Sequence, residues 1–118
     1  MFLVVTRNFP PDVGGMQILM EGLSNELSRH GAVKVYADEC LNSNNYDSKS
    51  SLNIERIKGF KFLRKYRKAN LVNDFINSNS GIKGIFVDHW KSLELLKVQN
   101  LKKTKVFCLL HSKEINHK

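Results

Sequence analysis

The chain has 118 residues, of which 42% are hydrophobic and 25% charged, a composition typical of one small soluble domain with a hydrophobic core. No apolar stretch reaches the roughly 20 residues that span a bilayer, and the start lacks the features of a signal peptide, so we expect a cytoplasmic protein. The net charge of +8 is uneven: residues 1–50 carry four Lys and Arg against six Asp and Glu, and residues 51–118 carry fifteen against five. This asymmetry favours an anionic partner, which could be phosphate, nucleic acid or a membrane surface.

The first half of the sequence predicts two strands, one helix and a loop. Residues 2–6 form a short apolar, β-branched run, which indicates a buried strand. Residues 16–30 carry apolar side chains at helical spacing, and Gly31 supplies a left-handed stop for that helix. Residues 33–37 predict a second strand, whereas residues 41–51 are rich in Asn and Ser and indicate a surface loop.

The second half predicts three further strands and two helices. Residues 52–57 alternate in polarity as a strand does, and residues 84–87 and 105–110 are short apolar runs that indicate the fourth and fifth strands. A long helix is predicted over residues 60–79, and a short helix follows the fourth strand. The predicted order is therefore β-α-β-β-α-β-α-β.

The long helix is predicted to have one apolar stripe and one basic face. The stripe steps by four, three, three and four residues through Phe62, Tyr66, Ala69, Val72 and Ile76. The basic residues fall off this stripe, and those of the helix are Lys61, Arg64, Lys65, Arg67 and Lys68. We therefore expect the two aromatic residues of the stripe in the core and the basic residues on or beside the exposed face.

Short apolar strands separated by helices predict an α/β, Rossmann-like fold, which is a parallel sheet with helices on both faces. Right-handed crossovers bring the carboxyl ends of such strands to one edge of the sheet, where open α/β sheets bind their ligands. Three features follow strands at that edge: Gly14-Gly15 after the first strand, Asp88-His89-Trp90 after the fourth, and His111 after the fifth.

The two glycines lie at the start of the first helix. Without side chains, they leave the free backbone N–H groups of the first turn unobstructed, and these donors together with the helix dipole favour an anion such as phosphate. A glycine pair at this place is also commonly just a turn. The sequence matches neither the dinucleotide fingerprint G-x-G-x-x-G nor a P-loop.

The opening "LVVTRNFPPDVGGMQILMEGLSNELSRHGAVKVYADE" resembles that of the retaining GT-B glycosyltransferases often called family 4. Members begin with a short apolar strand, then FPP-x-x-GG, then a helix ending in L-x-x-x-G-H, and then a strand with alternating valines. The matching residues here are Phe9, Pro10, Pro11, Gly14, Gly15, Leu27, Gly31, Val33 and Val35. Later, "GIFVDHW" and "KVFCLLHSKE" resemble the fourth and fifth strands of the family, the latter ending at its characteristic histidine.

The resemblance implies transfer of a sugar from a nucleotide-sugar donor to a glycan or lipid-linked acceptor. By match, Gly14 and Gly15 would bind the donor diphosphate, His111 would be catalytic, and His89 and Glu114 would line the acceptor site. The family generally uses neither metal nor cofactor. No metal-ligand cluster in the sequence contradicts this expectation.

Further points of the sequence qualify the resemblance. Ala32 stands where many members have His, at a structural position. The second, donor-binding domain of the family, with its E-x7-E element and basic residues, is not found in residues 1–118. We therefore expect a partial N-terminal, acceptor-side domain of an incomplete GT-B enzyme, inactive alone. Cys40 and Cys108 are too few for a disulfide framework or zinc site and are expected to be reduced.

Each candidate site residue also has a structural interpretation. His111 could simply be a polar residue ending a strand, and Glu114 a solvated loop acid. His89 could belong to a helix start whose Trp90 packs on the core. For Asp88, capping of a short helix is favoured over a role as catalytic base. That helix would carry Leu93 and Leu96.

The basic cluster has three interpretations. It could be the solvated side of a helix, the commonest outcome, or it could bind nucleic acid or an anionic membrane. Nucleic acid is disfavoured because no aromatic interleaving or DNA-reading motif is recognisable. Contact with the inner membrane face would use Arg56, Lys61, Arg64, Lys65, Arg67 and Lys68. The alternative to the glycosyltransferase is thus a non-catalytic basic α/β module that binds nucleic acid or a membrane surface.

Overall fold

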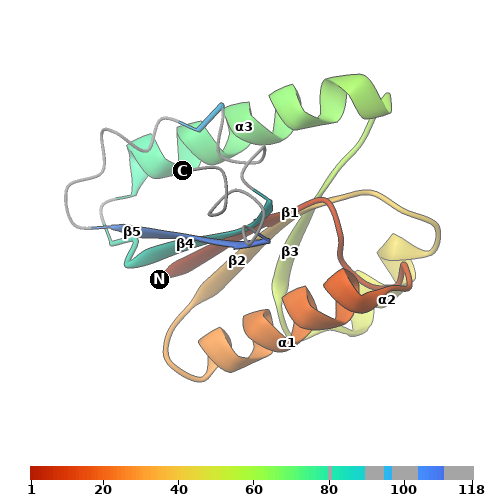
Figure 1. Ribbon diagram of the computed structural model, residues 1–118, viewed down its shortest axis with the longest axis horizontal. Helices are drawn as coiled ribbons and strands as arrows, with labels where there is room; N and C mark the ends of the chain where they lie inside the picture. Colours follow the sequence, from red (N-terminus) through yellow and green to blue (C-terminus); the bar gives the residue numbers. More distant parts are fainter. Residues whose placement is uncertain (80, 90–94, 97–103, 111–118) are drawn as a thin grey trace.

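The computed structural model describes residues 1–79, 81–89, 95–96 and 104–110, which form a parallel sheet of five strands with helices on both faces (Figure 1). The strands are β1 (Phe2–Thr6), β2 (Val33–Asp38), β3 (Asn53–Ile57), β4 (Gly84–His89) and β5 (Lys105–Leu110). The helices are α1 (Gly15–Ser28), α2 (Ser43–Lys49) and α3 (Lys61–Ser78). The predicted α/β, Rossmann-like fold class is confirmed.

The strand order is β3-β2-β1-β4-β5, and every neighbouring pair is parallel. The chain builds outward from β1 through β2 to β3, and α3 then carries it back across the sheet to β4 on the other side of β1. Helices α1 and α2 cover one face of the sheet and α3 covers the other (Figure 1). The order therefore reverses between β1 and β4, and ligands of open α/β sheets bind beside such a point.

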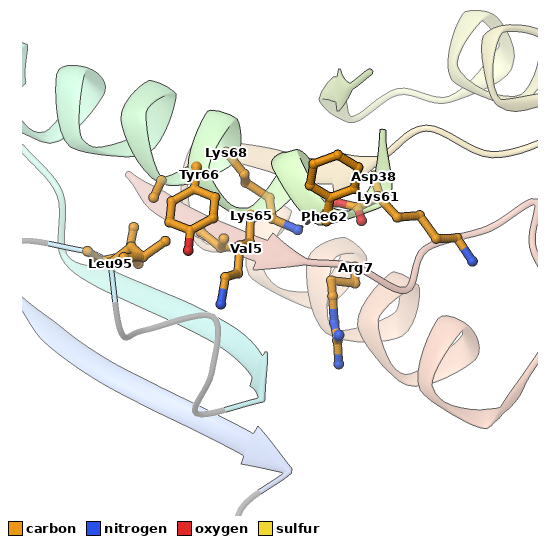
Figure 2. A pocket seen from close by; sticks show the side chains of 11 residues that line it. Val5, Arg7, Asp38, Lys61, Phe62, Lys65, Tyr66, Lys68 and Leu95 are labelled. Carbon is orange, nitrogen blue, oxygen red and sulfur yellow. Dashed lines mark hydrogen bonds and ion pairs between the residues drawn. The ribbon is translucent and has the colours of Figure 1, made fainter. Parts of the chain in front are cut away.

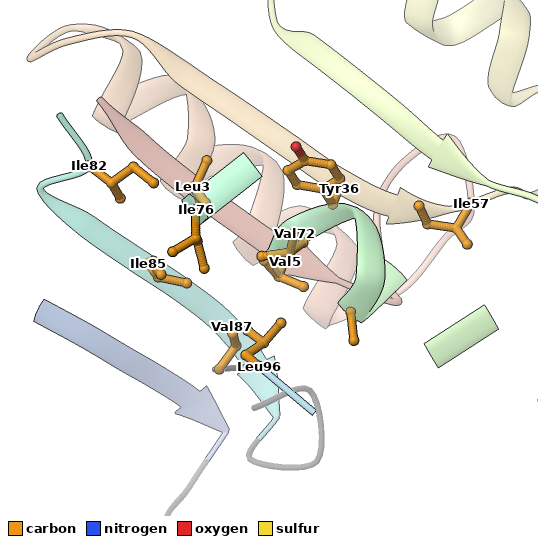
Figure 3. Close-up of a cluster of buried hydrophobic side chains, with 11 residues drawn as sticks. Leu3, Val5, Tyr36, Ile57, Val72, Ile76, Ile82, Ile85, Val87 and Leu96 are labelled. Carbon is orange, nitrogen blue, oxygen red and sulfur yellow. The ribbon is translucent and has the colours of Figure 1, made fainter. Parts of the chain in front are cut away.

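Two hydrophobic cores lie on opposite faces of the sheet. The core beneath α3 is formed by Leu3, Val5, Tyr36, Ile57, Ala69, Val72, Ile76, Ile82, Ile85, Val87 and Leu96 (Figure 3). The core on the α1 face is formed by Val4, Phe9, Met20, Val33, Val35 and Ala37. Because successive side chains of a strand point to opposite faces, a strand buried on both sides needs a continuous apolar run. That requirement explains the sequence of β1.

The predicted surface loop at residues 41–51 is wrong, because most of it forms the short helix α2. Asn42 precedes the helix in the left-handed conformation, with φ 65°. Tyr46 then packs edge-on against Phe9, with ring centroids 6.2 Å apart, and its hydroxyl donates a hydrogen bond to Glu21. Burial is the main cause that raises the pKa of Tyr46 above its ordinary value, and the hydrogen bond to Glu21 is the second. Tertiary contacts of this one tyrosine outweigh the weak helix propensity of Asn and Ser.

The predicted left-handed stop at Gly31 is also wrong, since its φ lies outside that region. Instead, the amides of Arg29 and His30 donate to carbonyls three residues earlier, at 3.1 and 2.9 Å, and so tighten the last turn. Gly31 has a packing role. A Cβ there would lie 3.3 Å from Cε2 of Phe2, tighter than an ordinary contact.

The apolar stripe of α3 is confirmed only in its second half. Ala69, Val72 and Ile76 are buried, but Phe62 is 72% and Tyr66 50% exposed, so the prediction that these two aromatics belong to the core is wrong. The first turns of α3 extend beyond the carboxyl ends of the strands (Figure 1). The stripe therefore reaches past the edge of the sheet, and its two aromatic side chains stay largely exposed.

Replacement of a core isoleucine should show which positions stabilise the sheet. Ile85→Ala, at a fully buried position of β4, should lower the free energy of unfolding by about 3 kcal/mol, because it removes buried methyl groups and leaves a cavity. Ile18→Ala, at a position of α1 that is 70% exposed, is the matched control and should change it by no more than about 0.5 kcal/mol. Urea unfolding measures both, and equal losses would contradict the described packing.

Candidate functional site

A buried carboxylate organises the point where the chain leaves β1. Asp88 lies near the end of β4 and is 1% exposed. Its Oδ2 accepts hydrogen bonds from Thr6 Oγ1 at 2.8 Å, from the Arg7 amide at 3.0 Å and from Asn8 Nδ2 at 2.9 Å. A buried carboxylate needs such donors, because an unpaired charge is costly to desolvate. The contacts fix the exit of β1 beside β4, where the strand order reverses.

The glycine turn follows on the α1 face, and its two glycines have different surroundings. A Cβ added to Gly14 would lie 2.4 Å from Oε1 of Gln17, so a larger residue there would have to displace the end of the Gln17 side chain. A Cβ added to Gly15 would meet nothing within 4 Å. The Gly14 carbonyl accepts the amide of Ile18 at 3.2 Å, and no side chain caps the first turn of α1. Gly15 thus lies at an open helix start.

On the opposite face, a cavity of about 570 Å³ lies between the first half of α3 and the carboxyl ends of β1 and β2 (Figure 2). We call it the basic cavity. It is lined by Val5, Arg7, Asp38, Lys61, Phe62, Lys65, Tyr66, Lys68, Ala69, Leu95 and Leu96. Its position at the carboxyl edge agrees with the predicted place of a site. Of the predicted site residues that the structure describes, Gly14, Gly15 and His89, none lines it.

Lys68 is the buried cation of the basic cavity, and its predicted place on the exposed face of the helix is wrong. The residue is 3% exposed. Its Nζ lies 2.6 Å from Oδ1 of Asp38 and donates to the Thr6 carbonyl at 3.1 Å. The sequence holds a signal for this burial, because Lys68 precedes Val72 by four residues and so shares its face of the helix. Asp38 also ends β2 at the edge where site residues were expected.

The other basic residues of the cluster are arranged differently. Arg56 is buried in an ion pair with Asp47 at 2.9 Å and donates to the Pro10 carbonyl at 2.5 Å. Arg64 and Arg67 donate to backbone carbonyls near the start of α3, at 2.7–3.1 Å. With Lys68 also buried, Lys61 and Lys65 are the two exposed lysines of the cluster that line the cavity. The basic surface is therefore smaller than the sequence suggests.

The structure brings together only part of the predicted site. His89 ends β4 and is partly buried at the carboxyl edge, next to Asp88. His111, Glu114 and Trp90 lie outside the described residues, as does most of the helix that Asp88 was expected to cap. Within the described part of the chain, no group of three or more His, Cys, Asp or Glu could hold a metal ion. Cys40 and Cys108 are both partly buried, and their reduced state stays a prediction.

Comparisons of the chain with protein families, with curated proteins and with solved structures find no match. The fold class thus stands on the structure itself. The resemblance to family 4 glycosyltransferases stays a prediction from the sequence. Function must therefore be argued from the two features at the carboxyl edge, the glycine turn on one face and the basic cavity on the other.

The role of Lys68 in the fold can be measured. Lys68→Met should lower the free energy of unfolding by about 3 kcal/mol, because it leaves the largely buried carboxylate of Asp38 without its cation and the Thr6 carbonyl without this donor. Lys65→Met, three residues earlier and exposed, is the control and should change stability by no more than about 0.5 kcal/mol. If urea unfolding gave the same small change for both variants, the buried ion pair would be contradicted.

Proposed function

We propose that the chain is the acceptor-side half of a retaining GT-B glycosyltransferase of the family 4 type, which transfers a sugar from a nucleotide-sugar donor to a glycan or lipid-linked acceptor. The observation that carries the proposal is the open turn at Gly15, placed where the family motif FPP-x-x-GG predicts it. It follows the strand at which the sheet order reverses.

The chemistry of the turn suits a leaving diphosphate. In the transfer, the bond between the sugar and the diphosphate breaks, and negative charge develops on the leaving phosphate oxygen. Amides of the first turn of α1, together with the positive end of the helix dipole, would stabilise that charge. The open space at Gly15 lets a phosphate approach the backbone closely. Such donors would do this work without a metal, in line with the metal independence of the family.

A transferase needs donor and acceptor sites side by side, and the carboxyl edge offers two features. The glycine turn leads from β1 into α1 on one face of the sheet (Figure 1), and the basic cavity lies on the α3 face (Figure 2). Both adjoin the exit of β1, which Asp88 holds. We assign the turn to the donor and the α3 side to the acceptor. The roles of His111, His89 and Glu114 remain proposals carried over from the family match.

The proposal also includes a second α/β domain. By the same resemblance, that domain would supply most of the donor site, and the present chain alone would bind donor weakly and transfer no sugar. The fold described here would then be one wall of a cleft. A polypeptide that joins both domains is the form in which transfer can be assayed.

A second candidate is a basic module that binds an anionic membrane or nucleic acid. The observation that favours it is a pair of exposed aromatic rings at the start of α3. Phe60, just before the helix, and Phe62 in its first turn are each 72% exposed and stack with centroids 5.9 Å apart, near Lys61 and Lys65. Among the described helices, none is long and apolar enough to cross a bilayer. The contact with a membrane would therefore be peripheral, through rings at the interface and lysines at anionic headgroups.

The two candidates predict different results for one pair of variants. Gly15→Leu places a side chain where the diphosphate would approach, and should weaken binding of a nucleoside diphosphate such as UDP by at least about tenfold. Gly22→Leu, at an equally open position later in α1, is the matched control and should leave binding unchanged. Both binding and fold can be followed by amide NMR of the labelled chain.

The decisive signals are those of the first turn of α1. Under the proposal, UDP shifts the amides of residues 15–17 in the unmodified chain and in Gly22→Leu, but not in Gly15→Leu. If UDP leaves these amides unmoved up to about 10 mM, or if Gly15→Leu responds as the unmodified chain does, the donor role of the turn is rejected. Salt-dependent retention on anionic vesicles or nucleic acid, with no response to UDP, would favour the basic module.

A further inference from the structure

We propose that the basic cavity binds a small phosphorylated ring compound, such as a sugar phosphate, with the phosphate held by Lys68, Lys65 and Arg7 and the ring held by aromatic side chains of α3. Its role as the acceptor rests on the proposed function, whereas the binding itself does not. The cavity of about 570 Å³ is within the range of sites for small molecules.

The lining of the basic cavity carries an excess of positive charge. Four cationic side chains, Arg7, Lys61, Lys65 and Lys68, line the cavity, and Asp38 is the one carboxylate among its described lining residues. That carboxylate is paired with Lys68 at 2.6 Å, so it presents little free negative charge to a ligand. The excess of positive charge matches a phosphate dianion better than a single carboxylate.

The ammonium group of Lys68 is buried beside the basic cavity. Lys68 is 3% exposed, yet it lines the cavity. A lysine has three N–H donors, and within the described residues two acceptors are bonded to this one, Asp38 and the Thr6 carbonyl. The remaining donor is available to a ligand that enters the cavity. Figure 2 shows Lys65 and Lys68 extending from α3 toward β1, with Arg7 at the end of that strand.

Two aromatic rings of α3 are exposed at the same cavity. Phe62 and Tyr66 line the cavity while 72% and 50% exposed, and Nζ of Lys65 lies 5.3 Å from the centroid of the Tyr66 ring. Exposed rings beside cations offer an apolar surface for the ring of a ligand and a positive group for its charge. A carbohydrate ring is suitable, because its faces carry C–H groups and its rim carries hydroxyl groups.

The depth of the site argues for a small molecule over a polymer or a membrane. The Lys68 ammonium group lies at the carboxyl ends of β1 and β2, where it bonds Thr6 and Asp38, and is almost inaccessible from the surface. A bilayer or a nucleic acid could contact the exposed Lys61 and Lys65. Only a small group that enters the cavity could reach Lys68, and a terminal phosphate is such a group.

The test uses the full 118-residue chain and three soluble probes, inorganic phosphate, glucose 6-phosphate and glucose. Glucose 6-phosphate should bind, with amide shifts concentrated at residues 65–69, and glucose should bind at least about tenfold more weakly. Inorganic phosphate should bind with intermediate affinity, because it can pair with the cations but has no ring to pack against the aromatic side chains. If neither phosphorylated probe saturates the chain up to about 10 mM, the proposal is overturned.

Variants then locate the site. Lys65→Gln and Arg7→Gln change exposed positions. Each should weaken glucose 6-phosphate binding by about tenfold while leaving the stability of the fold unchanged. Tyr66→Ala should weaken the binding of glucose 6-phosphate but not the binding of inorganic phosphate. Lys83→Gln, at an exposed position before β4 at the opposite edge of the sheet, is the matched control and should have no effect. If the Lys83 and Lys65 variants weakened glucose 6-phosphate binding equally, the binding would depend only on net charge, and the proposed site would be rejected.

Two further comparisons separate the possible sources of phosphate and the two proposals. Vesicles containing phosphatidic acid should be displaced by glucose 6-phosphate if the natural ligand is a lipid headgroup, and should not bind if it is soluble. Vesicle binding that glucose 6-phosphate does not displace, without binding of the soluble probe, would overturn the site in favour of a surface contact. Gly15→Leu should leave glucose 6-phosphate binding unchanged. The proposal for the cavity can therefore be tested separately from the proposed donor role of Gly15.

Discussion

The organisation of the carboxyl edge depends on one buried carboxylate. Asp88 on β4 accepts hydrogen bonds from Thr6, Arg7 and Asn8, which are the last residue of β1 and the first two after it. A parallel sheet brings these two strands together, but it does not determine where the chain goes after β1 ends. The carboxylate does, because its burial requires donors and the exit of β1 supplies them. The turn that leads to Gly15 therefore starts from a fixed point.

A second tie joins the same exit to the other face of the sheet. Lys68 on α3 donates to the Thr6 carbonyl and pairs with Asp38 at the end of β2. Thr6 is thus held through its hydroxyl by β4 and through its carbonyl by α3. Replacing a buried ion pair by apolar residues is often neutral or stabilising. Stability alone therefore does not explain why the Lys68–Asp38 pair is present. Its place in the lining of the basic cavity suggests a use in binding, which is what we propose.

Sequence patterns predict the sheet well because burial on both faces leaves little freedom. The run at residues 2–6 corresponds to β1, and the fifth strand was predicted with its observed bounds, 105–110. Patterns fail where a distant contact decides the structure. The Asn-rich segment before β3 is helical because Tyr46 reaches Phe9 and Glu21 across the fold, which its composition does not show. Likewise, the stripe of α3 indicates which residues share a face, but not where the sheet beneath them ends.

The candidate site divides in the same way. The glycine turn was recognisable in the sequence because glycine before a helix has few roles, and a family motif contains it. The basic cavity was not recognisable, because it is formed by residues from β1, β2 and α3 that only the topology brings together. A lysine beside the apolar stripe of a helix is normally a surface residue, and this pattern places Lys68 in solvent. Its spacing of four from Val72 was the signal that it lies on the buried face, and Asp38 at a strand end was the signal of its partner.

The most direct test of the account is hydrogen exchange at the Arg7 amide, which donates to Asp88 and forms no strand bond in β1. Asp88→Ala should speed exchange of that amide by at least about tenfold more than exchange of the Val4 amide inside β1, and should shift the amide signals of both Gly15 and Lys68. Asp74→Ala, at an exposed position of α3, is the control and should do neither. Unchanged exchange at Arg7 in the Asp88 variant, or a change equal to that at Val4, would contradict the claim that this carboxylate holds the carboxyl edge together.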